Sequence, residues 1–167
     1  MKTVKKFLPA IVFLIAIVGS TQWATAQKTL SAKELSIKNA VDSQQYIFYA
    51  QSANPSGGRQ RTLTSEYTVT VLKDTISCDL PYFGRAYAAP MNSDAGIKFA
   101  ASTSFDYKLQ NRKKGGWSVT IKPKDSREVQ ELFFTIFSNG SASLHVTSAN
   151  RQPISFNGYI TQTKNKK

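Results

Sequence analysis

The residues best suited to contact a ligand lie in one stretch, DLPYFGRAYAAP, at positions 79–90. It places Tyr82, Phe83 and Tyr87 around Arg85, in a segment without the alternation of a regular strand. Aromatic rings can stack on a sugar-like or apolar molecule, and a guanidinium can bind an acidic group. The stretch is therefore predicted to line the rim of a binding site for a small ligand.

A later turn, SANRQP, can bring Asn150 and Arg151 to the same rim. The predicted ligand-contact set is Tyr82, Phe83, Arg85, Tyr87, Asn150 and Arg151. The alternative interpretation is structural, because connections of about 15 residues are usually either functional or locally packed. In that case the stretch is a packed flap that closes one end of a sheet, with Arg85 held by a carboxylate or by backbone carbonyls.

Groups for catalysis are scarce, because the chain has a single histidine and a single cysteine. His145 falls on the polar face of a predicted strand and Cys78 on an apolar face, so we expect a solvent-facing imidazole and a small buried thiol without a disulfide. A zinc site needs three or four ligands, and no phosphate-binding glycine motif is present. We predict no catalytic residue, no metal and no cofactor. A hydrolase with paired carboxylates, such as Asp79 and Asp106, is the weakest alternative.

The segment NRKKGG, residues 111–116, is predicted to be a hairpin loop followed directly by Trp117. Its three cations, from Arg112 to Lys114, can meet phosphate or sulfate groups while Trp117 stacks on the same ligand. Trp117 also keeps alternation with Val119, which favours burial of the indole below a solvated hairpin tip.

The chain is basic, with 22 Lys and Arg against 10 Asp and Glu and a formal net charge of +12. In an exported protein such a charge favours an acidic envelope component as partner, and we predict no nucleic-acid partner. The simpler interpretation is solubility, since a net charge far from zero keeps a protein soluble.

The N-terminus has the three parts of a secretory signal peptide. Lys2, Lys5 and Lys6 precede an apolar run over residues 7–19, and Ala24-Thr25-Ala26 supplies small residues for cleavage after Ala26. The run is too short to span a bilayer, so we expect a protein that is not integral to the membrane after cleavage. No cysteine lies at the cleavage site, which predicts a periplasmic or secreted protein without a lipid anchor. A single domain over 27–160 and a flexible basic tail over 161–167 complete the chain.

One helix and a series of strands are predicted after the signal peptide. Ser31 and Glu34 have the spacing of a capping box, which predicts a helix over about 32–44. Short strand-like segments follow at 46–50, 66–72, 75–80, 96–102, 104–110, 117–123, 131–137, 141–147 and 153–160, with a loop at 52–61. Several of them alternate, whereas 131–137 is apolar on both faces. This pattern is typical of an antiparallel meander. We predict a mainly β fold, a strongly curved sheet or small barrel, with the N-terminal helix at one opening or along an edge.

Three stretches together resemble the family catalogued as domain of unknown function 4251. They are LPYFGRAY (80–87), GIKF (96–99) and IFSNGSASLHVTSANRQPISFNG (136–158). The resemblance covers residues 34 to 160 and implies an exported protein of Bacteroidetes, without implying an activity. Some members carry a lipoprotein cysteine at the cleavage site, whereas this chain has Ala26-Gln27 there.

Two functions follow from these observations, in addition to the paired-carboxylate hydrolase. The first is a non-catalytic small binding module of the cell envelope. The second is an envelope structural or protein-interaction module without a small ligand.

Overall fold

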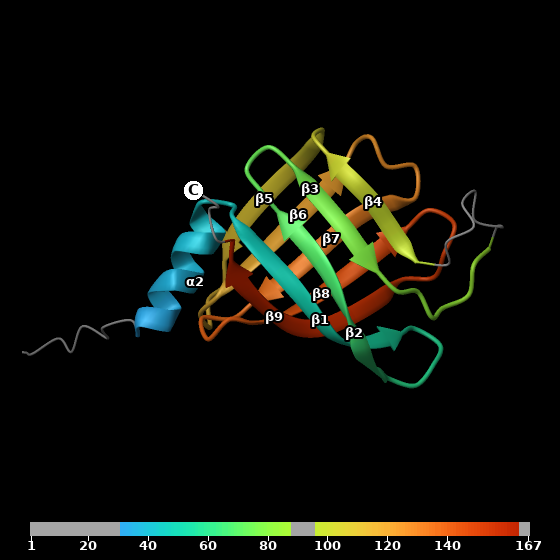
Figure 1. Ribbon diagram of the computed structural model, residues 1–167, viewed down its shortest axis with the longest axis horizontal. Helices are drawn as coiled ribbons and strands as arrows, with labels where there is room; N and C mark the ends of the chain where they lie inside the picture. The colour runs from blue at the N-terminus through green and yellow to red at the C-terminus, as the bar shows by residue number, and fades with distance from the viewer. Residues whose placement is uncertain (1–30, 88–95, 164–167) are drawn as a thin grey trace, which may run out of the picture.

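The computed structural model describes residues 31–87 and 96–163. The predicted signal peptide and residues 164–167 of the predicted tail lie outside the described residues. The described elements are one helix and nine strands (Figure 1). They are α2 (Ala32–Asp42), β1 (Tyr46–Pro55), β2 (Arg61–Val71), β3 (Ile76–Leu80), β4 (Ile97–Ser102), β5 (Phe105–Asn111), β6 (Trp117–Pro123), β7 (Val129–Ile136), β8 (Ser141–Ser148) and β9 (Ile154–Gln162).

Helix α2 begins at the predicted capping box. The Ser31 Oγ atom accepts from the backbone N–H of Glu34 at 3.2 Å, and the Glu34 carboxylate accepts from the Ser31 N–H at 2.9 Å. The helix ends at Asp42, and Gln44 then takes a positive φ of 55°. The buried side chains of the helix are Ile37, Ala40 and Val41. The helix covers one end of the sheet, next to the C-terminal part of β9 (Figure 1).

All nine strands form one antiparallel sheet in the order β4-β3-β2-β1-β9-β8-β7-β6-β5. Strands that follow each other in the chain are therefore neighbours, with the exception of β4 and β5, and the first strand also pairs with the last. The sheet curls into a nearly closed barrel whose two edge strands are β4 and β5 (Figure 1). The predicted mainly β fold with one N-terminal helix is confirmed.

Side chains pack the interior of the barrel. Tyr46, Phe48, Phe134 and Phe156 are fully buried. The Phe134 ring makes edge-to-face contacts with Tyr46 and Phe48, at centroid distances of 6.1 and 5.6 Å. Alternation produces this core, because every second residue of a strand points inward. Burial of Trp117 and Cys78 is confirmed as well.

The first hairpin is longer than predicted. The predicted loop at 52–61 is wrong, because β1 continues to Pro55 and β2 already begins at Arg61. An irregularity in the register between Ala50 and Ser52 allows the strand to bend and continue. Strand β9 similarly runs to Gln162, two residues past the predicted end of the domain, because β1 continues to pair with it there.

Among the described residues, no helix combines the length and the apolar character needed to cross a bilayer.

Candidate functional site

The flap, defined as residues 81–87, lies against the turn between β8 and β9. Ala86 and Arg151 form an isolated antiparallel bridge. The Tyr87 N–H donates to the Asn150 carbonyl at 2.7 Å, and the Gln152 N–H donates to the Arg85 carbonyl at 3.0 Å. The structure therefore brings the two predicted stretches together at the end of the barrel opposite the helix (Figure 1).

Arg151 contacts several segments at this end, and only 5% of it is exposed. Its Nε atom lies 2.6 Å from a carboxylate oxygen of Glu128, and its Nη1 atom donates to the Gly96 carbonyl at 3.1 Å. Its guanidinium lies over the Tyr82 ring, 4.9 Å from the centroid. Arg151 thus connects the start of β4, the segment before β7 and the flap.

Tyr82 completes this cluster through its hydroxyl. The Tyr82 Oη atom lies 2.8 Å from the Arg85 carbonyl oxygen and 3.1 Å from that of Gln152, so it can donate to either. Ring and hydroxyl are both occupied by contacts within the protein. Tyr82 and Arg151 therefore close this end, which supports the packed-flap alternative for these two residues.

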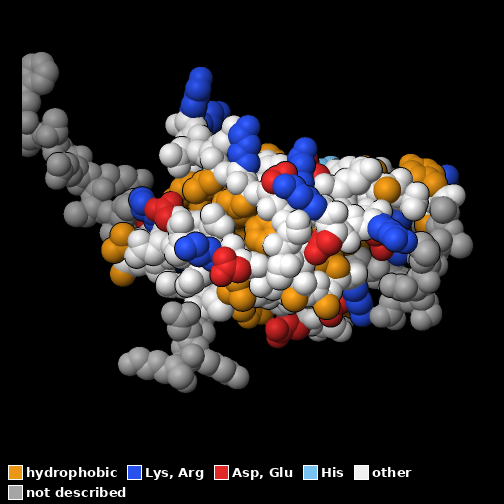
Figure 2. Space-filling view, turned by 90° about the horizontal axis from the view of Figure 1, so that it is seen from above, with side chains coloured by type: hydrophobic (Ala, Val, Ile, Leu, Met, Phe, Trp, Pro, Cys, Tyr) orange, Lys and Arg blue, Asp and Glu red, His pale blue; other side chains and the backbone are white. Residues whose placement is uncertain are grey.

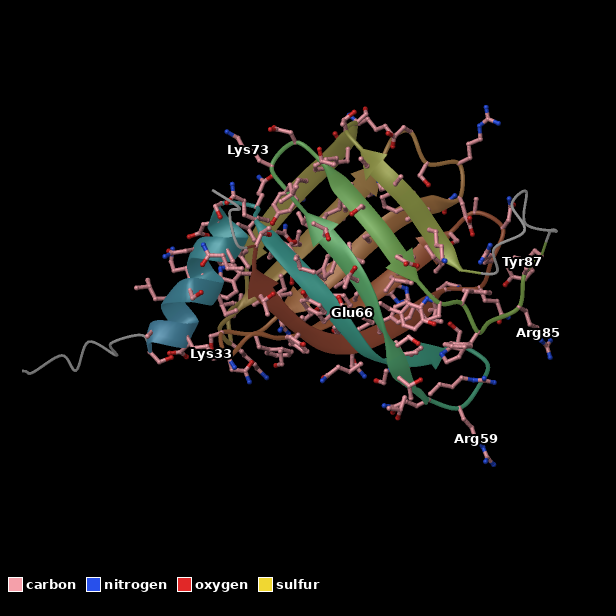
Figure 3. The ribbon with its side chains drawn as sticks, in the orientation of Figure 1. Lys33, Arg59, Glu66, Lys73, Arg85 and Tyr87 are labelled. Atoms are coloured by element: carbon pink, nitrogen blue, oxygen red, sulfur yellow. The ribbon has the colours of Figure 1, made fainter. Side chains whose placement is uncertain are left out.

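Arg85 does not take the predicted structural role. Its side chain is exposed and points away from the barrel (Figure 3), so the prediction that a carboxylate or carbonyls hold it is wrong. The carboxylate of Glu128 lies beside Arg151 instead. Glu128 directly precedes β7 and Arg151 follows β8, and these two strands pair.

The remaining members of the predicted set lie on the surface. Tyr87 is 70% exposed, and Asn150 is also exposed. Phe83 is partly exposed, and the guanidinium of Arg61 lies 4.9 Å from its ring centroid. Contact between a ligand and these side chains stays a prediction.

A surface pocket lies at the opposite end of the barrel, between α2 and the β5–β6 hairpin. We call it the hairpin pocket, and its volume is about 370 Å³. Its lining comes from the helix, the hairpin, β6 and the β7–β8 turn. The lining residues are Glu34, Lys38, Asn111, Arg112, Gly115, Gly116, Trp117 and Ser138.

The hairpin fixes one wall of this pocket. The Arg112 N–H donates to the Gly116 carbonyl, and the Gly115 N–H donates to the Arg112 carbonyl, both at 3.1 Å. Gly116 has a φ of +82°, and a Cβ atom at this position would lie 2.2 Å from the Ile136 carbonyl oxygen. Only glycine lets the hairpin approach β7 this closely, since any side chain would collide with backbone.

The hairpin pocket combines an aromatic wall with groups of both charges. Trp117 is 9% exposed. The Arg112 guanidinium lies 5.2 Å from the Phe137 ring centroid, and Arg112 is one of the lining residues. Lys38 forms an ion pair with Asp42 one helical turn away. Figure 2 shows hydrophobic side chains at both ends of the molecule, interspersed with basic and acidic groups.

The sequence indicated half of this site. Arg112 and Trp117 were predicted as a contact patch, with burial of the indole as the alternative, and Trp117 is both buried and one of the lining residues of the pocket. The contributions of Glu34, Lys38 and Ser138 were missed. The capping box was visible, but nothing in the sequence shows that the helix packs beside this hairpin.

The histidine and the cysteine considered for catalysis lie on different strands, β8 and β3. His145 is exposed, and its Nδ1 atom lies 2.9 Å from the Ser155 Oγ. Burial raises the pKa of the Cys78 thiol far above its usual range, so the thiolate nucleophile is disfavoured. Within residues 31–87 and 96–163, no group of three or more His, Cys, Asp or Glu side chains is arranged to hold a metal ion.

The two carboxylates considered for hydrolysis each lie beside a different lysine. Asp79 lies 3.6 Å from the Lys98 ammonium, and Asp106 lies 2.6 Å from the Lys124 ammonium. Each carboxylate is thus neutralised by a different lysine on the surface.

Fold and site define a small up-and-down β-barrel with a packed core, a helix at one end and a surface pocket beside it. A family model described as "Domain of unknown function (DUF4251)" matches residues 28–160. The chain belongs to this family.

A solved structure shows the same fold. It is the crystal structure of a DUF4251 family protein from Bacteroides eggerthii, with 18% sequence identity and a TM-score of 0.61. The match covers 78% of this chain and 87% of that one. No curated protein matches this chain.

Proposed function

We propose that the protein is an exported, non-catalytic binding module of the cell envelope and that the hairpin pocket is its ligand site. The observation that carries the proposal is the pocket beside Trp117, since its volume of about 370 Å³ falls within the range of small-molecule sites. Buried side chains fill the barrel interior, so a ligand is more readily bound in a surface pocket than inside the barrel.

The lining supports a sugar-like ligand that carries an acidic group. Trp117 offers the small apolar part of its surface that stays exposed, and a sugar ring can pack against it. Asn111 and Ser138 offer an amide and a hydroxyl to ring hydroxyls. Arg112 and Lys38 offer cations to a carboxylate or sulfate, and Arg112 can bind such a group with two parallel hydrogen bonds. An acidic envelope polysaccharide combines these features.

Trp117 supplies the measurement. The chain has two tryptophans, Trp23 and Trp117, and Trp23 lies in the predicted signal peptide. The processed protein would therefore report the pocket through the fluorescence of a single indole. We expect glucuronate to change this fluorescence with a Kd of about 1 mM or tighter, which corresponds to about 4 kcal/mol. Glucose, which has the same ring without the carboxylate, should bind more weakly.

Two variants test the site against a matched control. Arg112→Ala should weaken glucuronate binding about tenfold, because a charge-assisted hydrogen bond is lost. Arg59→Ala removes an exposed cation at the flap end and should leave the Kd unchanged (Figure 3). Calorimetric titration of the same proteins detects binding that leaves the fluorescence of Trp117 unchanged. If neither method detects any of a panel of neutral and acidic sugars, the binding proposal fails.

Export is tested separately. The protein should be recovered outside the cytoplasm with Gln27 as its first residue, which intact-mass measurement of the purified chain would show. A chain that retains residues 1–26 in the cytoplasmic fraction would contradict this part of the proposal.

A further inference from the structure

Strand β5 has one open edge. It pairs with β6 over its whole length, and β5 and β4 are the two ends of the strand order. Strand β4 runs from the flap end to one corner of the barrel, and β5 runs from that corner toward the helix end (Figure 1). An unpaired edge is a template for another strand.

The backbone of β5 shows which residues face this edge. The Ser104 carbonyl accepts from the Lys124 N–H at 2.7 Å, and the Arg112 N–H donates to the Gly116 carbonyl at 3.1 Å. Both groups point toward β6. Because backbone direction alternates along a strand, the N–H and C=O groups of Phe105, Tyr107 and Leu109 point toward the open edge.

The side chains of this segment are self-complementary. Read from either end, SFDYKLQ is polar, apolar, charged, tyrosine, charged, apolar and polar, with opposite charges at the two charged positions. We propose that β5 pairs antiparallel with β5 of a second copy of this chain, about a two-fold axis through Tyr107. The proposal is independent of the ligand of the hairpin pocket.

This register satisfies the backbone of both edges. Tyr107 lies opposite its own copy, and Phe105 lies opposite Leu109 of the second chain. These are hydrogen-bonded positions, since their polar groups face the open edge, and each facing pair exchanges two bonds. Leu109, which is 36% exposed, would gain an apolar neighbour.

The charges select the second copy as the partner. Asp106 lies opposite Lys108 of the second chain, and the symmetry repeats this pair. Both positions are non-hydrogen-bonded, where facing side chains are closest. Lys108 is exposed and has no ion-pair partner among the described residues. Asp106 contacts Lys124, and its 66% exposed carboxylate can accept from a second lysine.

Charge reversal tests the pairing in the purified protein expressed from the full chain. Sedimentation over a concentration series should show a dimer with a Kd tighter than about 0.5 mM, because an edge-to-edge contact is small and weak. Asp106→Lys and Lys108→Asp should each be monomeric, since each places like charges opposite each other twice. The double variant should dimerise again.

A mixture of the two single variants gives the sharpest result. Each is expected to be monomeric alone, whereas together they should form a heterodimer with two restored charge pairs. Glu66→Lys and Arg59→Asp make the same charge changes at exposed positions away from β5 and should leave the dimer intact. Circular dichroism establishes that every variant is folded.

A third variant tests the backbone contribution. Leu109→Pro removes an N–H that faces the open edge and spares the bonds to β6, so it should abolish dimerisation in a folded protein. The proposal is overturned by a wild-type protein that stays monomeric up to about 0.5 mM. It is also overturned if none of these variants weakens the dimer, or if a strand of another protein is found paired with β5.

Discussion

The flap end and the helix end of the barrel are closed by different kinds of contact. At the flap end, the guanidinium of Arg151 is buried between Glu128, Gly96 and Tyr82. At the helix end, α2 contributes three apolar side chains, and a glycine hairpin packs on backbone. At the flap end, the contacts of the Arg151 guanidinium occupy the space between the segments. At the helix end, the helix and the hairpin leave the hairpin pocket between them.

The largest expected effect comes from the flap end. Arg151→Ala should lower the free energy of unfolding by about 3 kcal/mol, because Glu128 loses its counter-ion in a partly buried site. Urea denaturation measures this change. Arg85→Ala is the matched control, since its exposed side chain should change stability by less than about 0.5 kcal/mol. Equal losses in both variants would contradict the role assigned to Arg151.

At the helix end, the two hairpin glycines give the next effect. In Gly115→Ala the new Cβ atom has open space around it. The free energy of unfolding should therefore fall by only about 1 kcal/mol, because of the left-handed backbone conformation. Gly116→Ala adds a collision with the Ile136 carbonyl and should cost at least about 1 kcal/mol more. Thermal unfolding compares the two. A similar cost for both would mean that the hairpin does not rest on β7 in solution.

The helix itself should respond more mildly. Ser31→Ala removes one half of the capping box and should destabilise α2 by about 1 kcal/mol. Hydrogen exchange of the amides at the start of α2 should become about fivefold faster. Ser65→Ala, at an exposed position of β2, serves as control. Unchanged exchange in the Ser31 variant would show that packing, and not the cap, holds the helix.

The last effect is a pH dependence at the helix end, and it is confined to strongly alkaline solution. Burial raises the pKa of Tyr107 to about 12 and that of Tyr46 well above its usual value. The native state therefore keeps protons that the unfolded state releases, so stability should be complete below about pH 10 and fall as the pH approaches 12. Denaturation curves across this range should show a smaller fall for Tyr107→Phe. If stability falls equally with pH in the wild type and in Tyr107→Phe, Tyr107 does not contribute to the pH dependence.

Local patterns predicted most of the fold. Alternation in β5, β6 and β8 identified strands and their buried faces, and the capping box located the start of α2. These signals depend on neighbours in the sequence, so they need no knowledge of the tertiary structure. The β1–β9 pair was not predicted, because it joins strands from the two ends of the domain.

The sites were harder to predict for the same reason. Arg85 and Arg151 look alike in sequence, and only the bridge between Ala86 and Arg151 decides which guanidinium is buried. The hairpin pocket needs α2 and the β5–β6 hairpin side by side, and no local pattern encodes that contact. Residue types indicated possible chemistry, while long-range packing decided where it is available.

The pairing of the first strand with the last has a consequence for the kinetics of folding. Strands β1 to β4 and β5 to β9 form two meanders, and in the strand order of the sheet they meet only where β1 pairs with β9. Closing that pair requires a loop of about 100 residues, and such non-local contacts form slowly. During synthesis, the edge of β1 that pairs with β9 stays unpaired until β9 has been made. A chain that matures this late stays open enough to be threaded through a membrane pore, which the proposed export demands.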